Sequence, residues 1–152
     1  MDPSEASVPV KVVPQGDVSA EALATLAEIA EEVNASLDLD EVLSRAAALI
    51  KKHIDYEIFG VLLIQEGVLK YRFAIGYPRD LAENLRIPVG QGITGTAALT
   101  GRSVCVGDVS TDPRYINALD NVRSELAVPL MIQGHAIGVL DIQSDQLDYF
   151  TT

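Results

Sequence analysis

Glycines are concentrated in one segment, residues 90–101, and this segment limits the folds open to the chain. Gly90, Gly92 and Gly95 match the G-x-G-x-x-G pattern of dinucleotide-binding folds. In those folds the glycines open a helix that connects two parallel strands, and the whole crossover takes a dozen or more residues. Here the helix can run only over about residues 93–99, because Thr100 and Gly101 end it and an extended run follows at once. The segment therefore argues against a doubly wound parallel sheet with a nicotinamide or flavin site.

The residues on either side of this segment predict two β-hairpins. An apolar run, a turn at Glu66 and Gly67, and a run that alternates apolar and polar residues make the first hairpin; a turn at residues 133–135 closes the second. The four expected hairpin strands are residues 56–65, 68–75, 125–132 and 136–144. Between the hairpins we expect short helices at 80–84 and 93–99 and strands at 85–89 and 104–106.

Two amphipathic helices precede the strands. Ser19 can cap the first, which we expect to end near Asn34, and Asp38 with Glu41 makes a capping box for the second. The first helix either joins the core or continues into a dimer seam. Residues 1–18, with three prolines, predict a mobile leader before a single domain over residues 19–152. This order predicts an α+β fold with an antiparallel sheet of five to six strands, helices on one face and long connections on the other.

Composition excludes several functional classes. The net charge is −11, and nine of the 22 acidic residues lie in the first 40 residues beside one lysine, so no basic surface for nucleic acid is expected. No apolar run has the length of a membrane span, and no signal peptide is visible, so we expect a cytoplasmic protein without a membrane partner. Cys105, His53 and His135 make no metal-binding cluster, and no metal site is expected.

Three stretches of the chain together resemble the GAF domains, a family of small-molecule sensor modules of bacterial signalling proteins. They are LDLDEVLSRAAALI, IPVGQGITGTAALTGRSVCVGDVSTDPRY and RSELAVPLMIQGHAIGVLDIQS, and the resemblance covers about residues 37–144. It implies a GAF-like α+β fold with a ligand between the sheet and the glycine-containing connection. Members of the family usually continue into a further helix after the last strand. We therefore expect a fragment of a longer signalling protein that lacks this C-terminal helix.

Strand alternation indicates which side chains can face such a ligand. Glu125 and Asp141 fall on the more polar face of the last two strands. Each is interpreted either as a pocket residue or as a surface residue, the latter free in solvent or paired with an arginine such as Arg123. The remaining candidates are apolar walls at Phe73, Ile93 and Tyr115, and polar groups at Thr94 and Asp108 beside the glycine turn and the following loop.

Specialised activities of the family are not supported by the sequence. Some members reduce free methionine sulfoxide through cysteines in these loops, but Thr94 stands where one thiol would be expected, and Cys105 lies between two valines of a strand. Patterns typical of cyclic nucleotide, bilin or haem binding are not found, although the sequence leaves cyclic nucleotide binding open. We therefore expect no catalytic residue and no enzyme activity. The sequence does not indicate a cofactor, which stays unknown.

The resemblance leads to a sensor hypothesis. A small molecule would bind in the pocket and control an output domain of the same full-length chain, such as a serine phosphatase of sigma-factor regulation, a histidine kinase or a diguanylate cyclase. The alternatives are a ligand-free GAF module for dimerisation or scaffolding, and a methionine sulfoxide reductase. A homodimer is expected, and a filled or polar-lined cavity would distinguish a sensor from a scaffold.

Overall fold

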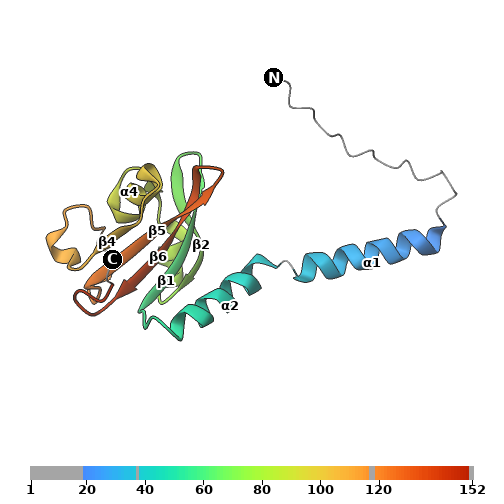
Figure 1. The fold of residues 1–152 in the computed structure, drawn as a ribbon, viewed down its shortest axis with the longest axis horizontal. Coiled ribbons are helices and arrows are strands. Elements are labelled where there is room, and N and C mark those ends of the chain that lie inside the picture. The colour runs from blue at the N-terminus through green and yellow to red at the C-terminus, as the bar shows by residue number, and fades with distance from the viewer. Residues whose placement is uncertain (1–18, 37, 117–118, 151–152) are drawn as a thin grey trace, which may run out of the picture. The chain divides into compact units, whose positions relative to one another are not determined.

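The computed structural model describes residues 19–36, 38–116 and 119–150. The chain divides into two units, Met1–Asp38 and Leu39–Thr152. The described part of the first unit is mainly one helix, α1 (Ala20–Ser36). The second unit contains α2 (Leu39–Lys51) and the whole β-sheet (Figure 1). Within the described residues, no helix has both the length and the apolar character needed to cross a membrane.

Helix α1 begins where its capping residue predicts. The Ser19 hydroxyl accepts a hydrogen bond from the Ala22 amide at 3.2 Å, which satisfies one of the first free N–H groups of the helix. Leu23, Leu26 and Ile29 are more than half exposed. The helix thus presents an apolar side that is not buried.

Six strands form one antiparallel sheet in the order β3-β2-β1-β6-β5-β4. The strands are β1 (Ile58–Gln65), β2 (Val68–Ile75), β3 (Ile87–Pro88), β4 (Val104–Val106), β5 (Ser124–Ile132) and β6 (His135–Ser144). The expected α+β fold with a sheet of five to six antiparallel strands is therefore confirmed.

Both hairpins close through two-residue turns with left-handed backbone. Glu66 and Gly67 have φ of 52° and 77°, and Gln133 and Gly134 have φ of 48° and 79°. Two positive φ angles match the right-handed twist of antiparallel strands, so these short loops fix the strand pairing next to each turn, and a register shift follows farther along each hairpin. The first turn lies where the sequence predicts it, and the second is one residue shorter than predicted, because His135 begins β6.

The two faces of the sheet carry separate apolar clusters. On one face, Ala47 of α2 is fully buried and packs with Tyr56, Phe59 and Ile142. On the other face, α4 (Gly92–Thr100) places Ile93 and Ala97 against Leu62 and Val139. The short elements α3 (Arg79–Asn84) and η1 (Val109–Thr111) belong to the connections between the strands. The sheet therefore separates α2 from the connection that contains α4.

The glycines of residues 90–95 form a tight turn into α4. Gly90 and Gly92 have φ of 94° and 69°, a region that other residues rarely adopt. A Cβ atom at Gly95 would lie 2.7 Å from the Pro88 carbonyl oxygen, and the Gly90 amide donates to the Gly95 carbonyl at 2.8 Å. The G-x-G-x-x-G match is thus explained by backbone geometry that brings the start of α4 onto the sheet.

A β-bulge interrupts the pairing of β1 with β2. Val61 pairs with Phe73, but the next residue, Leu62, pairs with Tyr71, so β2 has one extra residue at this point. An extra residue shifts the alternation of side chains between the two faces. Phe73 consequently packs in the cluster on the α2 side, where its ring lies 6.3 Å from that of Phe59.

Cys105 of β4 is half-buried on the α2 side of the sheet. Its thiol donates to the Phe150 carbonyl oxygen at 3.2 Å, and burial raises the pKa of the thiol. A neutral thiol is a poor nucleophile. These contacts support a structural role.

Replacing Cys105 by serine is expected to lower the free energy of unfolding by about 1 kcal/mol, because a polar hydroxyl replaces a packed thiol. Urea denaturation measures the change. Rapid modification of the native protein by a thiol reagent would contradict the premise that the thiol is protected.

Candidate functional site

A small cavity lies between the sheet and the connection that contains α4. It has about 20 Å³ of room for a water-sized molecule. Strands, the turn before α3, the first turn of α4 and the segment after η1 all contribute to its wall. The lining residues are Tyr71, Tyr77, Leu85, Ile87, Ile93, Thr94, Tyr115, Ile116, Glu125, Asp141 and Gln143.

Two carboxylates, Glu125 and Asp141, lie in this cavity. Glu125 is on β5 and Asp141 on β6, and their side chains are 4% and 1% exposed. The register explains their proximity, because Glu125 pairs with Gln143 and Ala127 pairs with Asp141 on the adjacent strand. Side chains two residues apart on a strand share one face of the sheet. The pocket interpretation of their position therefore agrees with the structure, whereas the surface interpretation does not.

Asp141 is held by neighbouring donors on one of its two oxygens. Its Oδ2 atom accepts a hydrogen bond from Gln143 Nε2 at 2.7 Å and another from the Tyr71 hydroxyl at 3.3 Å. Its Oδ1 atom and the Oε1 atom of Gln143 are buried without a partner within the described structure. Buried polar atoms are normally hydrogen-bonded, and leaving one unpaired costs about 1–3 kcal/mol. Both atoms can accept a donor that enters the cavity, and Asp141 can also accept one from the neighbouring Glu125 carboxyl when that group is protonated.

Burial and mutual repulsion change the ionisation of the two carboxyl groups. Loss of solvation raises the pKa of Glu125 well above its usual value, and the neighbouring Asp141 raises it further. Burial also raises the pKa of Asp141, although hydrogen bonds from Glu125, Gln143 and Tyr71 oppose that rise. The groups that donate hydrogen bonds to Asp141 stabilise its charged form. Glu125 is therefore the carboxyl group that more readily stays protonated.

Three tyrosines complete the polar wall. Desolvation raises the pKa of Tyr71 well above its usual value and that of Tyr77 to about 12, and it also raises the pKa of Tyr115. The rings of Tyr71 and Tyr77 lie 5.2 Å apart. All three phenols therefore remain neutral at physiological pH and can donate or accept hydrogen bonds.

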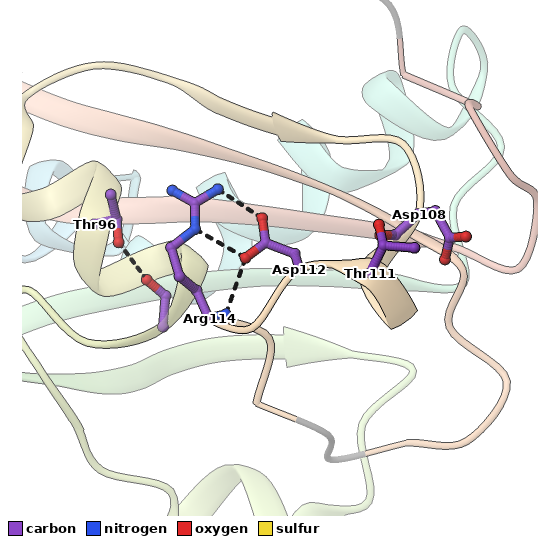
Figure 2. Close-up of polar contacts among 6 residues, drawn as sticks. Thr96, Asp108, Thr111, Asp112 and Arg114 are labelled. Carbon is purple, nitrogen blue, oxygen red and sulfur yellow. Dashed lines mark hydrogen bonds and ion pairs between the residues drawn. The ribbon is translucent and has the colours of Figure 1, made fainter.

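An ion pair lies near the cavity in the segment after η1. Arg114 forms a forked contact with Asp112, with Nε to Oδ1 at 3.0 Å and Nη2 to Oδ2 at 2.7 Å (Figure 2). The Arg114 amide also donates to Asp112 Oδ1 at 2.9 Å. This contact lowers the pKa of Asp112. Arg114 and Asp112 act on Glu125 with opposite signs, so the pair contributes little net charge to the cavity.

The structure brings five of the seven predicted ligand-binding residues together. Ile93, Thr94, Tyr115, Glu125 and Asp141 all line the cavity, and their ligand contacts remain predictions.

The other two lie elsewhere. The β-bulge moves Phe73 to the α2 side of the sheet. Asp108 caps η1, where its Oδ1 accepts from the Ser110 amide at 3.0 Å and from the Ser110 hydroxyl at 2.6 Å. In Figure 2, Asp108 lies at the far end of the segment from Arg114. A capping role therefore accounts for Asp108.

Tyr71, Tyr77 and Gln143 were not predicted as site residues, although all three line the cavity. Gln143 follows the same alternation as Asp141, so that signal was present in the sequence. Tyr71 depends on the bulge and Tyr77 on the turn before α3, and neither is visible from residue spacing. Within the described residues, no group of three histidine, cysteine or acidic side chains is arranged to hold a metal ion.

Comparisons with known proteins identify related chains. A family model described as GAF domain matches residues 38–152. The chain is 30% identical over 106 residues to the free methionine-R-sulfoxide reductase of Escherichia coli, covering 70% of this chain and 62% of that protein. The structure resembles that of the free methionine-R-sulfoxide reductase from Neisseria meningitidis in complex with its substrate, at 34% identity and a TM-score of 0.67, covering 75% of this chain and 67% of that chain. A Nif-specific regulatory protein of Azospirillum brasilense is 27% identical over 128 residues, covering 79% of this chain and 20% of that protein.

The match covers only part of the length of several relatives. The chain spans between 41% and 45% of the length of three other curated relatives.

The expectation that the chain is not an enzyme is contradicted by these similarities. Free methionine-R-sulfoxide reductases share both its sequence pattern and its fold. The sequence argument considered catalysis only through cysteines at particular loop positions. A fold hosts more than one chemistry, so the absence of one thiol pattern did not justify excluding enzyme activity.

Proposed function

The chain belongs to the GAF domain family, and from this membership and its cavity we propose that it is a sensory module that binds a small molecule between the sheet and α4. The observation that carries this proposal is the pair of buried acceptors without partners, Asp141 Oδ1 and Gln143 Oε1, in one cavity. A cavity that served only as core would be lined by apolar groups. A bound ligand supplies donors to both acceptors, whereas in the empty cavity a protonated Glu125 can donate only to Asp141.

The acceptors define the chemistry of the ligand. Glu125, Asp141 and Gln143 provide carboxylate and amide oxygens, and the described lining residues include no lysine, arginine or histidine. Such a site favours a group that carries positive charge and several N–H donors, such as an amine. The cavity volume of about 20 Å³ suits the ammonium group of a primary amine. The rest of the ligand would require a shift of the connection that contains α4.

Strand alternation gives a physical route from the cavity to α2. Asp141 of β6 faces the cavity, while its neighbour Ile142 faces the opposite cluster that contains Ala47 of α2. A shift of β6 that accompanies ligand binding therefore changes the packing under α2. Regulation requires that the ligand bind one of two states more tightly than the other.

The output would be an attached domain in the full-length protein. A serine phosphatase of sigma-factor regulation, a histidine kinase and a diguanylate cyclase are the proposed output classes. Support for regulation comes from the similarity to a Nif-specific regulatory protein, of which the matched segment covers only a fifth.

Ligand retention tests the proposal directly. Native mass spectrometry of protein purified from cells is expected to reveal a bound small molecule, and adding that molecule is expected to raise the melting temperature. The absence of any retained molecule, together with no thermal stabilisation by a panel of amines, amino acids and nucleotides, would reject the sensor function.

We also propose that the chain forms a homodimer through α1, as a dimerisation module would. Leu23, Leu26 and Ile29 are 56%, 59% and 51% exposed, and contiguous exposed apolar side chains commonly mark an interaction surface. Light scattering at increasing protein concentration is expected to give a mass that rises to twice that of the chain. The double variant Leu23→Gln/Leu26→Gln is expected to remain a monomer, whereas Glu28→Gln on the opposite side of α1 is expected to dimerise as the wild type does.

A constant monomer mass at high concentration would contradict self-association. An equal dimer fraction in the leucine variant would contradict the assignment to α1.

Reduction of free methionine-R-sulfoxide is a second candidate function, favoured by the similarity to two reductases. Cys105 is the one thiol of the chain, and it lies in the cluster on the α2 side, away from the cavity. A turnover assay with free methionine-R-sulfoxide and a dithiol reductant tests this candidate. Turnover that is lost in Cys105→Ser would assign a thiol mechanism, and turnover that persists in Cys105→Ser would assign a mechanism without the thiol.

A further inference from the structure

Glu125 and Asp141 share the cavity without a compensating cation. Both side chains are at least 96% buried, and no described lining residue is basic. An isolated buried carboxylate is strongly destabilised, and two adjacent carboxylates disfavour ionisation of both. The cavity geometry therefore limits the negative charge that the empty site can hold.

The charged groups around the pair do not remove this restriction. From β2 and the turn before α3, Tyr71 and Tyr77 face the pair as neutral phenols, and Tyr115 does so from the segment after η1. Arg114 is the basic residue that acts on Glu125, but its guanidinium is already held by the Asp112 carboxylate through two bonds (Figure 2). Its positive charge is thus largely neutralised before it can compensate the pair.

The hydrogen bonds indicate which carboxyl group keeps the proton. Asp141 Oδ2 accepts from Gln143 Nε2 and from the Tyr71 hydroxyl, and these donors favour the ionised form of Asp141. A protonated Glu125 can in turn donate to Asp141, which lies beside it. One proton held by the pair, mainly on Glu125, therefore gives Asp141 a donor in the empty cavity, while Gln143 Oε1 keeps no partner among the described residues.

We propose that this site exchanges a proton for the cationic group of its ligand. In the empty cavity Glu125 and Asp141 together hold one proton; when an ammonium group enters, Glu125 ionises and that proton leaves to solvent. The charge inside the cavity is then conserved, because one positive charge replaces another. This inference rests on the proposed function of the cavity as a ligand site and adds the coupling of binding to pH.

The exchange determines how binding depends on pH. When one proton is released for each ligand bound, the dissociation constant rises tenfold for each unit by which the pH is lowered. The dependence disappears once the pH is high enough for both carboxyl groups to be ionised in the empty protein. A module of this kind responds jointly to its ligand and to acidification.

The first experiment examines the protein without ligand. Carbon-13 NMR of side-chain carboxyl groups, recorded between pH 5 and 9 on the full chain, is expected to reveal one carboxyl that remains protonated at pH 7. Its signal is expected to be missing in Glu125→Gln and present in Asp145→Asn, a control that removes an exposed carboxylate next to the end of β6. Two fully ionised carboxylates at pH 7 in the wild type would overturn the proposal.

The second experiment uses methylammonium chloride as the probe. Calorimetry in two buffers of different ionisation enthalpy is expected to show release of about one proton for each methylammonium bound at pH 7. Glu125→Gln is expected to release none, and Asp145→Asn is expected to match the wild type. Methylammonium binding without proton release would overturn the exchange and leave the sensor function intact.

The remaining outcome is also decisive. A protonated pair that does not bind methylammonium, in a protein that retains an uncharged ligand from cells, would overturn the cationic part of the proposal. The sensor function fails by a different result, namely that no small molecule of any kind is retained or stabilises the fold.

Discussion

Replacing Asp141 by asparagine is expected to weaken binding of an amine ligand roughly 10- to 150-fold, which corresponds to about 1.5–3 kcal/mol. Asp141 supplies a buried carboxylate oxygen that is available for a charge-assisted hydrogen bond once Glu125 has released its proton. Asparagine keeps the shape of the side chain but removes its charge. Calorimetric titration with methylammonium chloride, or with the ligand retained from cells, measures the loss.

The neighbouring carboxyl group limits the size of this effect. Once Asp141 is neutral, Glu125 ionises more easily and supplies part of the missing charge. The double variant Asp141→Asn/Glu125→Gln is therefore expected to bind more weakly than either single variant. Asp145→Asn changes the total charge by the same amount at an exposed position and is expected to bind as the wild type does. Equal affinity in Asp141→Asn and Asp145→Asn would remove Asp141 from the site.

Replacing Glu125 by glutamine is expected to change how folding stability depends on pH. The pKa of Glu125 is raised in the folded state, whereas its value in the unfolded chain is about 4.3. Between these two values the folded protein keeps a proton that the unfolded chain has lost. Raising the pH therefore favours unfolding, and stability falls by up to about 1.4 kcal/mol for each pH unit until the folded pKa is reached.

Glutamine resembles a protonated glutamate and does not ionise. At about pH 4, where Glu125 is largely protonated in the unfolded chain as well, Glu125→Gln and the wild type are expected to have similar unfolding free energies. At higher pH the variant becomes the more stable of the two. Urea denaturation followed by circular dichroism at pH 4, 5, 6, 7 and 8 measures both curves, and Asp145→Asn is expected to run parallel to the wild type. A constant gap between Glu125→Gln and the wild type across this range would refute the raised pKa of Glu125.

These two predictions depend on a site that strand alternation already located in part. Period-two alternation put Glu125 and Asp141 on one face of β5 and β6, and both line the cavity. The Gln133–Gly134 turn sets only the register beside it, because β6 has one extra residue, Ile137, between the Met131–Ala136 and Leu130–Gly138 pairs. Beyond this irregularity the strands alternate without interruption, so the faces of Glu125 and Asp141 follow from alternation, whereas their register does not.

Only the tertiary structure shows which face a side chain occupies where a β-bulge interrupts the alternation along a strand. On β2 the sequence predicted Tyr71 and Phe73 on one face, yet the bulge opposite Val61 and Leu62 sends Tyr71 to the cavity and Phe73 to the α2 side. A bulge adds one residue to one strand, and its place is set by packing against β1. No residue type in β2 marks that place.

The environment of the two carboxylates likewise could not be predicted from the sequence. The sequence alone left Glu125 and Asp141 open to a surface or a pocket interpretation, because a strand residue is exposed or buried according to what covers its face. The glycine turn at residues 90–95 was visible in the sequence, but only the folded chain shows that it brings α4 over these carboxylates. Local spacing thus determined the strands, the turns and the faces of Glu125 and Asp141. The bulges, the burial of the carboxylates, the raised pKa of Glu125 and the pairing of Arg114 with Asp112 arise from contacts between segments distant in the chain or from backbone geometry that spacing does not specify.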